Sequence, residues 1–384
     1  MSAHSYNDPR RPVPFHQKLG DIDWLLVGLI TAIACIGFAM LYSAADGSFS
    51  PWAGRQMMRF VIGFGILVAV ACVDLRVWMG LAYPAYVFSL LLLVAVEVAG
   101  RVGLGAQRWI ELGPLQLQPS ELMKIALVLA LARFLHGLEP GEISRPTRLA
   151  VALMMIGAPV VLVLLQPNLG TAMLLALCGA LLLFLAGLSW YWIGPTVAAV
   201  VVAVPMVWQF ALHDYQKQRV MTFLNPDTDA LGAGWNITQA KIALGSGGIV
   251  GKGFLLGTQS RLNFLPEKET DFIFTMIGEE FGFFGSMALL VLFAVVIYYG
   301  IQIAMKARSQ FGRLLAMGIT INFFLYIMIN GLMVMGLIPV VGIPMPLISY
   351  GGTAMMTVMF GFGLLMSVHV HRGVTVPRRS SGMI

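Results

Sequence analysis

Apolar runs of about 20 residues follow one another along nearly the whole chain, and a helix needs that length to cross the hydrocarbon core of a bilayer. Hydrophobic residues make up 58% of the 384 residues and charged residues 11%, which is outside the usual range for a soluble globular domain. The sequence therefore predicts an all-α integral membrane protein with about ten transmembrane helices. They are expected at roughly 24–43, 57–73, 77–97, 121–136, 147–165, 170–188, 190–211, 271–300, 312–338 and 353–371.

The basic residues indicate how these helices are oriented. Lys and Arg concentrate in the cytoplasmic loops of membrane proteins, and here they flank alternate ends of the predicted helices, so both termini are expected to be cytoplasmic. The expected organisation is a cytoplasmic tail at 1–20, a single polytopic membrane domain at 21–372 with an extracytoplasmic loop at about 212–270, and a second tail at 373–384. The supporting residues are Arg10, Arg11, Lys18, Arg133, Arg145, Arg148, Lys306, Arg308, Arg313, Arg372, Arg378 and Arg379.

Cysteine usage and net charge argue against several classes of function. Cys35, Cys72 and Cys178 lie inside apolar runs and show neither metal-ligand nor disulfide spacing. The formal net charge is +6, but loop basicity in a membrane protein reports orientation first. We therefore expect no dedicated metal site, no redox chemistry and no nucleic-acid partner.

Three carboxylates stand immediately before the eighth predicted helix, in the stretch LPEKETDF. Asp271 would lie at the outer membrane boundary, at the start of that helix, with Thr270 as its N-cap. The helix N-terminus favours the charged form of a carboxylate and apolar neighbours favour the neutral form, so such a group can be tuned to act as a general base. The alternative is an acid that only neutralises the helix terminus, which explains Glu267 and Glu269 less well.

A second charged motif, QPSELMKIAL, opens the fourth predicted helix. Pro119 and Ser120 suit a helix start, and Glu121 and Lys124, three residues apart, share one face of the first turn. Lys124 would meet an anionic substrate with Glu121 positioning it, or the two would form a self-neutralising pair at the membrane interface. Both alternatives are open from these residues.

Glu279 and Glu280 lie about 12 Å further along the eighth helix at 1.5 Å per residue, where an isolated charge is costly. They are expected to face protein or water. We expect at least one of them to pair with an intramembrane basic residue, for which Arg59 is a candidate, and contact with substrate is the less favoured alternative.

Basic residues are also expected on the outer face. Arginine binds diphosphate groups bidentately, so arginines near a carboxylate base suit a phosphate leaving group. At a membrane edge the same side chains often meet lipid head groups instead. The residues concerned are Arg101, Arg108, Lys217 and Arg219.

Four long stretches of this sequence resemble one known family. They are QRWIELGPLQLQPSELMK, LLQPNLGTA, the stretch from RVMTFLNPD to TDFIFTMIGEEFG, and GLIPVVGIPMPLISYGGT. Together they resemble the SEDS family (shape, elongation, division and sporulation), most closely its rod-shape members. The resemblance implies a ten-helix fold and a peptidoglycan glycosyltransferase that polymerises lipid II on the periplasmic face of the bacterial inner membrane. It also implies a class B penicillin-binding transpeptidase as partner.

The resemblance also assigns roles to residues. The family's essential acid falls on Asp271, its PSELMK pair on Glu121 and Lys124, and its loop arginines on Arg108 and Arg219. Many relatives have QPDLGT where this chain has QPNLGT, so Asn168 stands in place of an acid. An amide can orient a hydroxyl or an amine but cannot act as a base.

The implied reaction joins a GlcNAc 4-hydroxyl to the anomeric carbon of a second lipid-linked sugar and displaces a lipid diphosphate with inversion. A divalent cation such as Mg²⁺ would be able to share the diphosphate charge. The rival hypotheses are a flippase for the lipid-linked precursor and a non-catalytic scaffold that activates a transpeptidase.

Overall fold

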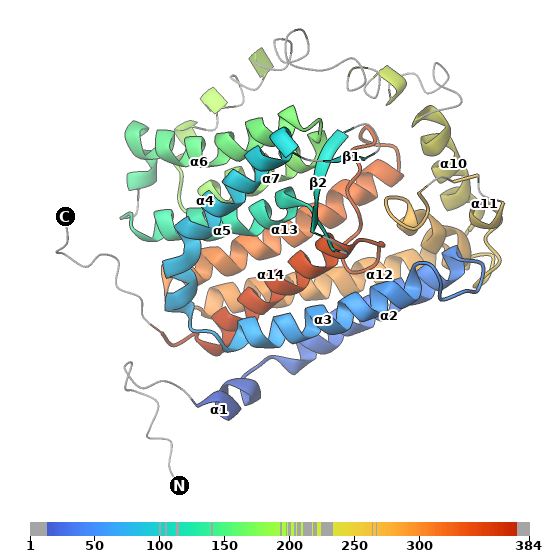
Figure 1. The fold of residues 1–384 in the computed structure, drawn as a ribbon, viewed down its shortest axis with the longest axis horizontal. Coiled ribbons are helices and arrows are strands. Elements are labelled where there is room, and N and C mark those ends of the chain that lie inside the picture. Colours follow the sequence, from blue (N-terminus) through green and yellow to red (C-terminus); the bar gives the residue numbers. More distant parts are fainter. Residues whose placement is uncertain are drawn as a thin grey trace.

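The computed structural model describes residues 14–374, apart from residues 100, 104–105, 113–114, 140, 263 and 266 and most of 193–232. Long helices dominate the described chain (Figure 1). They are α1 (Phe15–Gly20), α2 (Trp24–Ala44), α3 (Ala53–Cys72), α4 (Leu75–Ala99), α5 (Pro119–His136), α6 (Pro146–Leu165), α7 (Leu169–Leu185), α10 (Ala233–Ser246), α11 (Thr258–Arg261), α12 (Ile273–Lys306), α13 (Gln310–Val334) and α14 (Gly352–Val370).

Nine of the ten predicted membrane helices coincide with helices of the described chain. Seven helices of the described chain are long and apolar enough to cross a membrane, namely α2, α3, α4, α6, α12, α13 and α14. The predicted spans at 121–136 and 170–188 correspond to α5 and α7, and most of the one at 190–211 lies outside the described residues. The prediction of an all-α integral membrane protein is confirmed, whereas the count of ten helices stays a prediction.

The first and last described segments meet at one end of the bundle. Lys18 Nζ in α1 donates to the carbonyl of Cys72 at the end of α3, and Ser367 Oγ in α14 donates to the carbonyl of Val73, both at 2.8 Å. We call this the terminal end. The opposite end, called the loop end, carries α10 and α11 at the right of Figure 1. The first and last described segments thus lie at the same end of the bundle, and the cytoplasmic location of the termini stays a prediction.

The segment between α4 and α5 contains a small sheet to which the sequence analysis assigned no secondary structure. Strands β1 (Arg101–Gly103), β2 (Ala106–Leu112) and β3 (Leu115–Leu117) form an antiparallel sheet in the order β1-β2-β3. In the second pair, Ile110 lies opposite Leu117 and Leu112 opposite Leu115. Strand β3 ends at Leu117 and α5 begins at Pro119, so the sheet leads directly into that helix.

Helix α13 lies at the centre of the bundle. In its most apolar stretch 72% of the residues are buried, against 28% in α4 and 22% in α12. Figure 1 shows α13 between α5 and α14. A Cβ at Gly318 of α13 would lie 2.5 Å from the Val128 side chain of α5, so glycine permits this close approach. The central position of α13 matters because two of its polar side chains reach the candidate site.

Helix α12 is interrupted at Gly282, whose φ of 64° and ψ of −156° are not helical. A positive φ of this kind is readily adopted by glycine. The interruption divides α12 into an outer part, 273–281, which follows Asp271, and a long inner part, 283–306.

Candidate functional site

Asp271 is partly buried and lies two residues before the first residue of α12. The predicted N-cap at Thr270 is wrong, because the helix begins at Ile273 and the N-cap position is occupied by Phe272 without a side-chain cap. The Thr270 hydroxyl instead donates to the carbonyl of Glu267 at 3.2 Å. Asp271 therefore belongs to a turn that leads into the helix and not to its first turn.

Asn330 of α13 holds this turn in place. Its Nδ2 donates to the backbone carbonyl of Asp271 at 2.9 Å and to the carbonyl of Ile343 at 2.7 Å. Gly342, with φ of 70°, is so close that a Cβ there would be 3.4 Å from Asp271 Oδ2. One side chain thus ties the Asp271 turn to the segment 336–351, which connects α13 to α14.

The segment 336–351 also binds the residues just before Asp271. Ser349 Oγ donates to the carbonyl of Thr270 at 2.5 Å, and the Tyr350 amide donates to the carbonyl of Glu269 at 2.8 Å. On its other side, Gln56 Nε2 of α3 donates to the carbonyl of Ser349 at 3.0 Å. The contacts to 269–271 from Asn330, Ser349 and Tyr350 all use backbone carbonyls, and none of them uses the carboxylate of Asp271.

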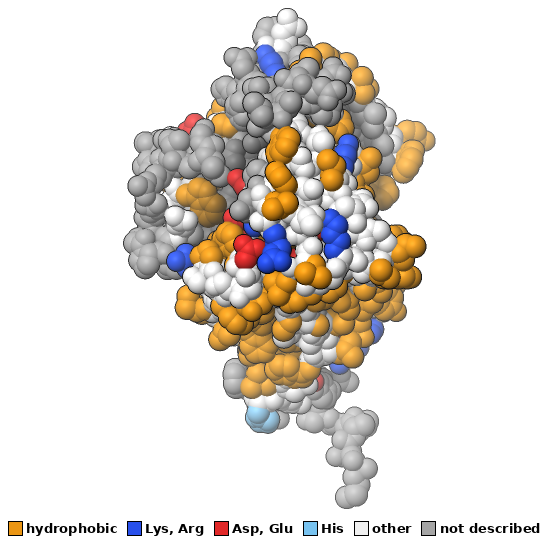
Figure 2. Space-filling model, turned by 90° about the vertical axis from the view of Figure 1, so that its right-hand side faces the viewer, with side chains coloured by type: hydrophobic (Ala, Val, Ile, Leu, Met, Phe, Trp, Pro, Cys, Tyr) orange, Lys and Arg blue, Asp and Glu red, His pale blue; other side chains and the backbone are white. Residues whose placement is uncertain are grey.

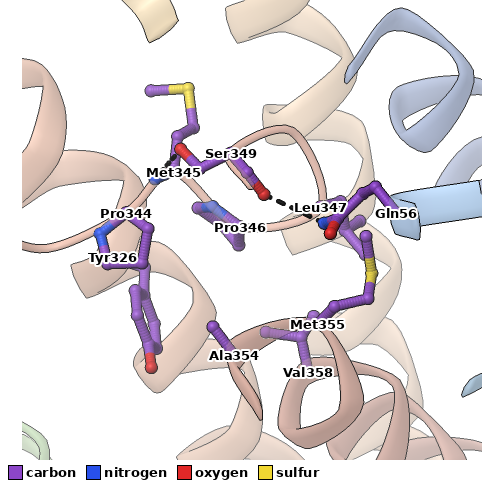
Figure 3. A pocket seen from close by; sticks show the side chains of 10 residues that line it. All are labelled: Gln56, Tyr326, Pro344, Met345, Pro346, Leu347, Ser349, Ala354, Met355 and Val358. Carbon is purple, nitrogen blue, oxygen red and sulfur yellow. Dashed lines mark hydrogen bonds between the residues drawn. The ribbon is translucent and has the colours of Figure 1, made fainter. Parts of the chain in front are cut away.

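A small pocket lies beside this segment (Figure 3). Figure 3 shows the pocket bounded by segment 344–349, by Tyr326 of α13, by Gln56 of α3 and by the start of α14. It has room for about one water molecule. In this conformation it is too small for a sugar ring.

Glu121 and Lys124 form the ion pair that their spacing predicted. Lys124 Nζ lies 2.6 Å from Glu121 Oε1, and their side chains are 2% and 4% exposed respectively. Tyr326 of α13, which the sequence analysis missed, donates to Glu121 Oε2 at 2.6 Å, contacts Lys124 Nζ, and places its ring 4.2 Å below that ammonium. These contacts support the structural alternative, in which the pair neutralises itself and joins α5 to α13.

The ion pair and the Asp271 turn share one face of α13. Tyr326 and Asn330 are four residues apart, which places them on the same side of the helix and about 6 Å apart along its axis. A site that contains both Asp271 and Lys124 requires helices far apart in the chain to converge. The structure brings both to neighbouring turns of α13.

Asn168 is 6% exposed and caps α7, because its Oδ1 accepts from the Thr171 amide at 3.3 Å. The first turn of α7 packs closely against segment 336–351, because a Cβ at Gly170 would lie 2.6 Å from the carbonyl oxygen of Val341. The amide thus fixes the start of a helix that supports the segment 336–351.

Replacing Asn168 by Ala is expected to lower the free energy of unfolding by about 1 kcal/mol, the usual cost of losing an N-cap. Asn168→Asp retains the acceptor and is the matched control. Thermal unfolding of the two purified variants in the same detergent measures the difference. Equal unfolding midpoints for wild type and Asn168→Ala would contradict the capping role.

The two arginines of the predicted site are not placed by the structure. Arg108 lies in β2, but its side chain is outside the described part, and Arg219 lies outside the described residues altogether. Their contact with substrate stays a prediction.

The expected partner of the buried glutamates is wrong. Glu279 forms an ion pair with Lys252 at 2.7 Å, and Glu280 contacts the hydroxyl of Ser43 in α2. The Arg59 guanidinium instead lies over the ring of Tyr350, 4.7 Å from its centroid. Lys252 comes from the glycine-rich stretch before α11, whose fold the sequence analysis did not predict.

The loop end combines charged and apolar surface. Figure 2 views this end and shows Lys, Arg, Asp and Glu side chains gathered near its centre, above a broad band of hydrophobic side chains. One pair in this region is Arg261 Nε with Asp46 Oδ1, at 3.9 Å. Among the described residues no group of three or more His, Cys, Asp or Glu side chains is arranged to hold a metal ion.

Comparisons with known proteins agree with this architecture. The family model described as "Cell cycle protein", which covers FtsW, RodA and SpoVE, matches residues 22–373. The chain is 48% identical over 299 residues to "Peptidoglycan glycosyltransferase MrdB" of Escherichia coli K12, covering 77% of this chain and 80% of that protein. It is 35% identical over 370 residues to "Probable peptidoglycan glycosyltransferase FtsW" of Trichlorobacter lovleyi, covering 91% of this chain and 94% of that protein.

Solved structures show the same fold. The crystal structure of the Thermus thermophilus rod shape determining protein RodA matches with a TM-score of 0.70 and 30% identity, over 91% of this chain and 97% of that one. A chain from a structure on the coordination of polymerization and crosslinking by a peptidoglycan synthase complex matches with a TM-score of 0.79 and 34% identity, over 91% and 98%. The family match spans most of the sequence, and the chain therefore belongs to the SEDS family, which includes FtsW, RodA and SpoVE.

Proposed function

We propose that this multi-pass membrane protein is a peptidoglycan glycosyltransferase that polymerises lipid II into glycan strands during cell elongation. The observation that carries the proposal is the 48% identity to a protein named for this activity, over 77% of the chain. The arrangement around Asp271 supports it, because the structure holds this acid at the start of a membrane helix through backbone contacts.

In the proposed reaction Asp271 is the general base. Its carboxylate takes the proton of the GlcNAc 4-hydroxyl as that oxygen forms a bond to the anomeric carbon of the second sugar. The bond from that carbon to the lipid diphosphate breaks at the same time, which inverts the anomeric configuration. The diphosphate leaves with the electron pair, and cationic groups stabilise its charge.

Arg108 and Arg219 are the proposed cations for the diphosphate, whose charge a divalent cation such as Mg²⁺ would be able to share. Lys124 is almost completely buried beside Glu121, so in this conformation it acts on the site through Tyr326 and α13. Asn168 supports the site by capping α7.

The proposed setting is the bacterial inner membrane, with the loop end and Asp271 on the periplasmic side. The proposed partner is a class B penicillin-binding transpeptidase. Support comes from the similarity to a chain of a peptidoglycan synthase complex that links polymerization to crosslinking.

The test is glycan synthesis by the purified chain from lipid II in detergent, with and without the transpeptidase. The proposal expects long glycan products that depend on this chain. Movement of lipid II across the membrane of vesicles that contain the purified chain, with no polymer in the detergent assay, would favour a flippase. Polymer that forms equally well when Asp271 is replaced by Asn would favour a scaffold and overturn the proposal.

A further inference from the structure

At the interruption of α12, the preceding stretch 247–253 supplies hydrogen-bond partners for the helix backbone. At the break, the amides of Phe283 and Phe284 donate to the carbonyls of Gly248 and Ile249, at 2.9 and 3.2 Å. Backbone polar groups at membrane depth need such partners, because the hydrocarbon core supplies none. The stretch 247–253 therefore substitutes for the missing turn of the helix.

Hydrogen bonds also run in the opposite direction. The amides of Lys252 and Gly253 donate to the carbonyls of Glu279 and Glu280, at 3.0 and 2.9 Å. Gly251, with φ of 84°, is so close that a Cβ there would collide with the carbonyl oxygen of Glu280. The two segments are thus joined along their backbones, and glycine is required at the closest approach.

The carboxylate of Glu279 adds side-chain contacts between these two segments. Glu279 Oε1 lies 2.7 Å from Lys252 Nζ and accepts from the Thr258 amide at 2.8 Å, the Gln259 amide at 3.0 Å and the Thr258 hydroxyl at 3.0 Å. Its side chain is 1% exposed. Charge-assisted hydrogen bonds of this kind are the stronger ones in proteins. Glu279 therefore binds the stretch 252–259 to the outer part of α12.

That outer part of α12, 273–281, links the Glu279 contacts to Asp271. Asn330 and segment 336–351 hold its beginning, and Glu279 lies eight residues beyond Asp271, about 12 Å along the axis. The break at Gly282 separates it from the inner part of the helix. Its middle packs on α10, where a Cβ at Gly278 would lie 2.4 Å from the Leu244 side chain, and hydrogen bonds hold its two ends.

We propose that Glu279 is a positioning residue, which fixes the outer part of α12, and with it Asp271, by clamping the stretch 252–259. The proposal rests on the proposed function in taking Asp271 as the base. Glu279 itself does not contact substrate in this role. It acts on the rate of the chemical step by holding the base in a productive place.

The test compares Glu279→Gln with Glu280→Gln in the full chain with its transpeptidase. Both changes remove one buried carboxylate from adjacent positions. Glu280 accepts from the Ser43 hydroxyl and from the backbone of Leu255, and the side-chain oxygen of a glutamine can still accept both bonds. Among the contacts of the described residues, only Glu279 of these two carries the ion pair to Lys252, which glutamine cannot form. We expect Glu279→Gln to lower kcat about 10- to 100-fold, the range for a small misplacement of a catalytic group, with KM changed less than about threefold. Glu280→Gln should retain most of kcat.

Two further measurements isolate the clamp. Lys252→Met should lower kcat too, and the double variant with Glu279→Gln should be little worse than the worse single one, since both remove one interaction. Amide hydrogen exchange in 273–281 should be faster in Glu279→Gln than in wild type and Glu280→Gln. Lys252 is 26% exposed, so its variant tests the clamp even if Glu279→Gln does not fold.

Equal losses of kcat in the two glutamine variants, or a wild-type kcat in both Glu279→Gln and Lys252→Met, would overturn the clamp. Full activity of Asp271→Asn would overturn the base assignment alone. In that case the exchange measurement still decides whether Glu279 holds the outer part of α12.

Discussion

Replacing Asp271 by Asn is expected to reduce glycan synthesis from lipid II about 10²- to 10⁴-fold, the usual contribution of a general base. Asn has nearly the same shape but cannot take the proton of the attacking hydroxyl. The fold should persist, because Asn330, Ser349 and Tyr350 hold this turn through backbone carbonyls that the substitution leaves in place. The measurement is the rate of polymer formation by the purified variant with its transpeptidase.

Glu267→Gln is the matched control. It removes the same charge four residues earlier, from an exposed side chain of the same turn. This variant should polymerise lipid II at nearly the wild-type rate. A similar loss in both variants would mean that the charge of the whole cluster matters, and near-normal synthesis by Asp271→Asn would remove Asp271 from the mechanism.

Lys124→Met is expected to lower the free energy of unfolding by about 3–5 kcal/mol, because it leaves a buried carboxylate without its cation. Glu121 is 4% exposed and keeps the hydroxyl of Tyr326, but one hydroxyl does not replace an ammonium at 2.6 Å. Denaturant or thermal unfolding in detergent micelles measures the loss. Stability is the primary readout here, since the pair joins α5 to α13.

The double variant Glu121→Gln with Lys124→Met provides the control, as it removes both charges and should recover part of the lost stability. A Lys124→Met variant that unfolds like the wild type would contradict the structural role. If such a variant also failed to make glycan, Lys124 would belong to substrate binding, the alternative that its spacing left open.

The membrane helices were predictable because each depends on local composition. Helices α6 and α13, for example, end within a few residues of the predicted limits, since a membrane span needs only a sufficient length of apolar sequence. The sheet at 101–117 was missed because its strands are short and pair with one another, and the strand pattern of so few residues is weak. The charged pair Glu121 and Lys124 was found because residues three apart on a helix must be neighbours.

The rest of the site depends on contacts between distant parts of the chain. Tyr326 meets Glu121 across 205 positions, and Ser349 meets Thr270 across 79. No local pattern marks either contact. For Glu279, the free-energy cost of burying a charge correctly predicted a basic partner, but that cost does not identify which residue the partner is. Lys252 is the partner because the glycine-rich stretch that carries it packs into the break in α12.

The shared face of α13 restricts how that helix can move. Tyr326 and Asn330 point to the same side, and turning the helix by one residue, about 100°, would withdraw both at once. Any rearrangement of this bundle that preserves both contacts must therefore leave the rotation of α13 about its own axis unchanged.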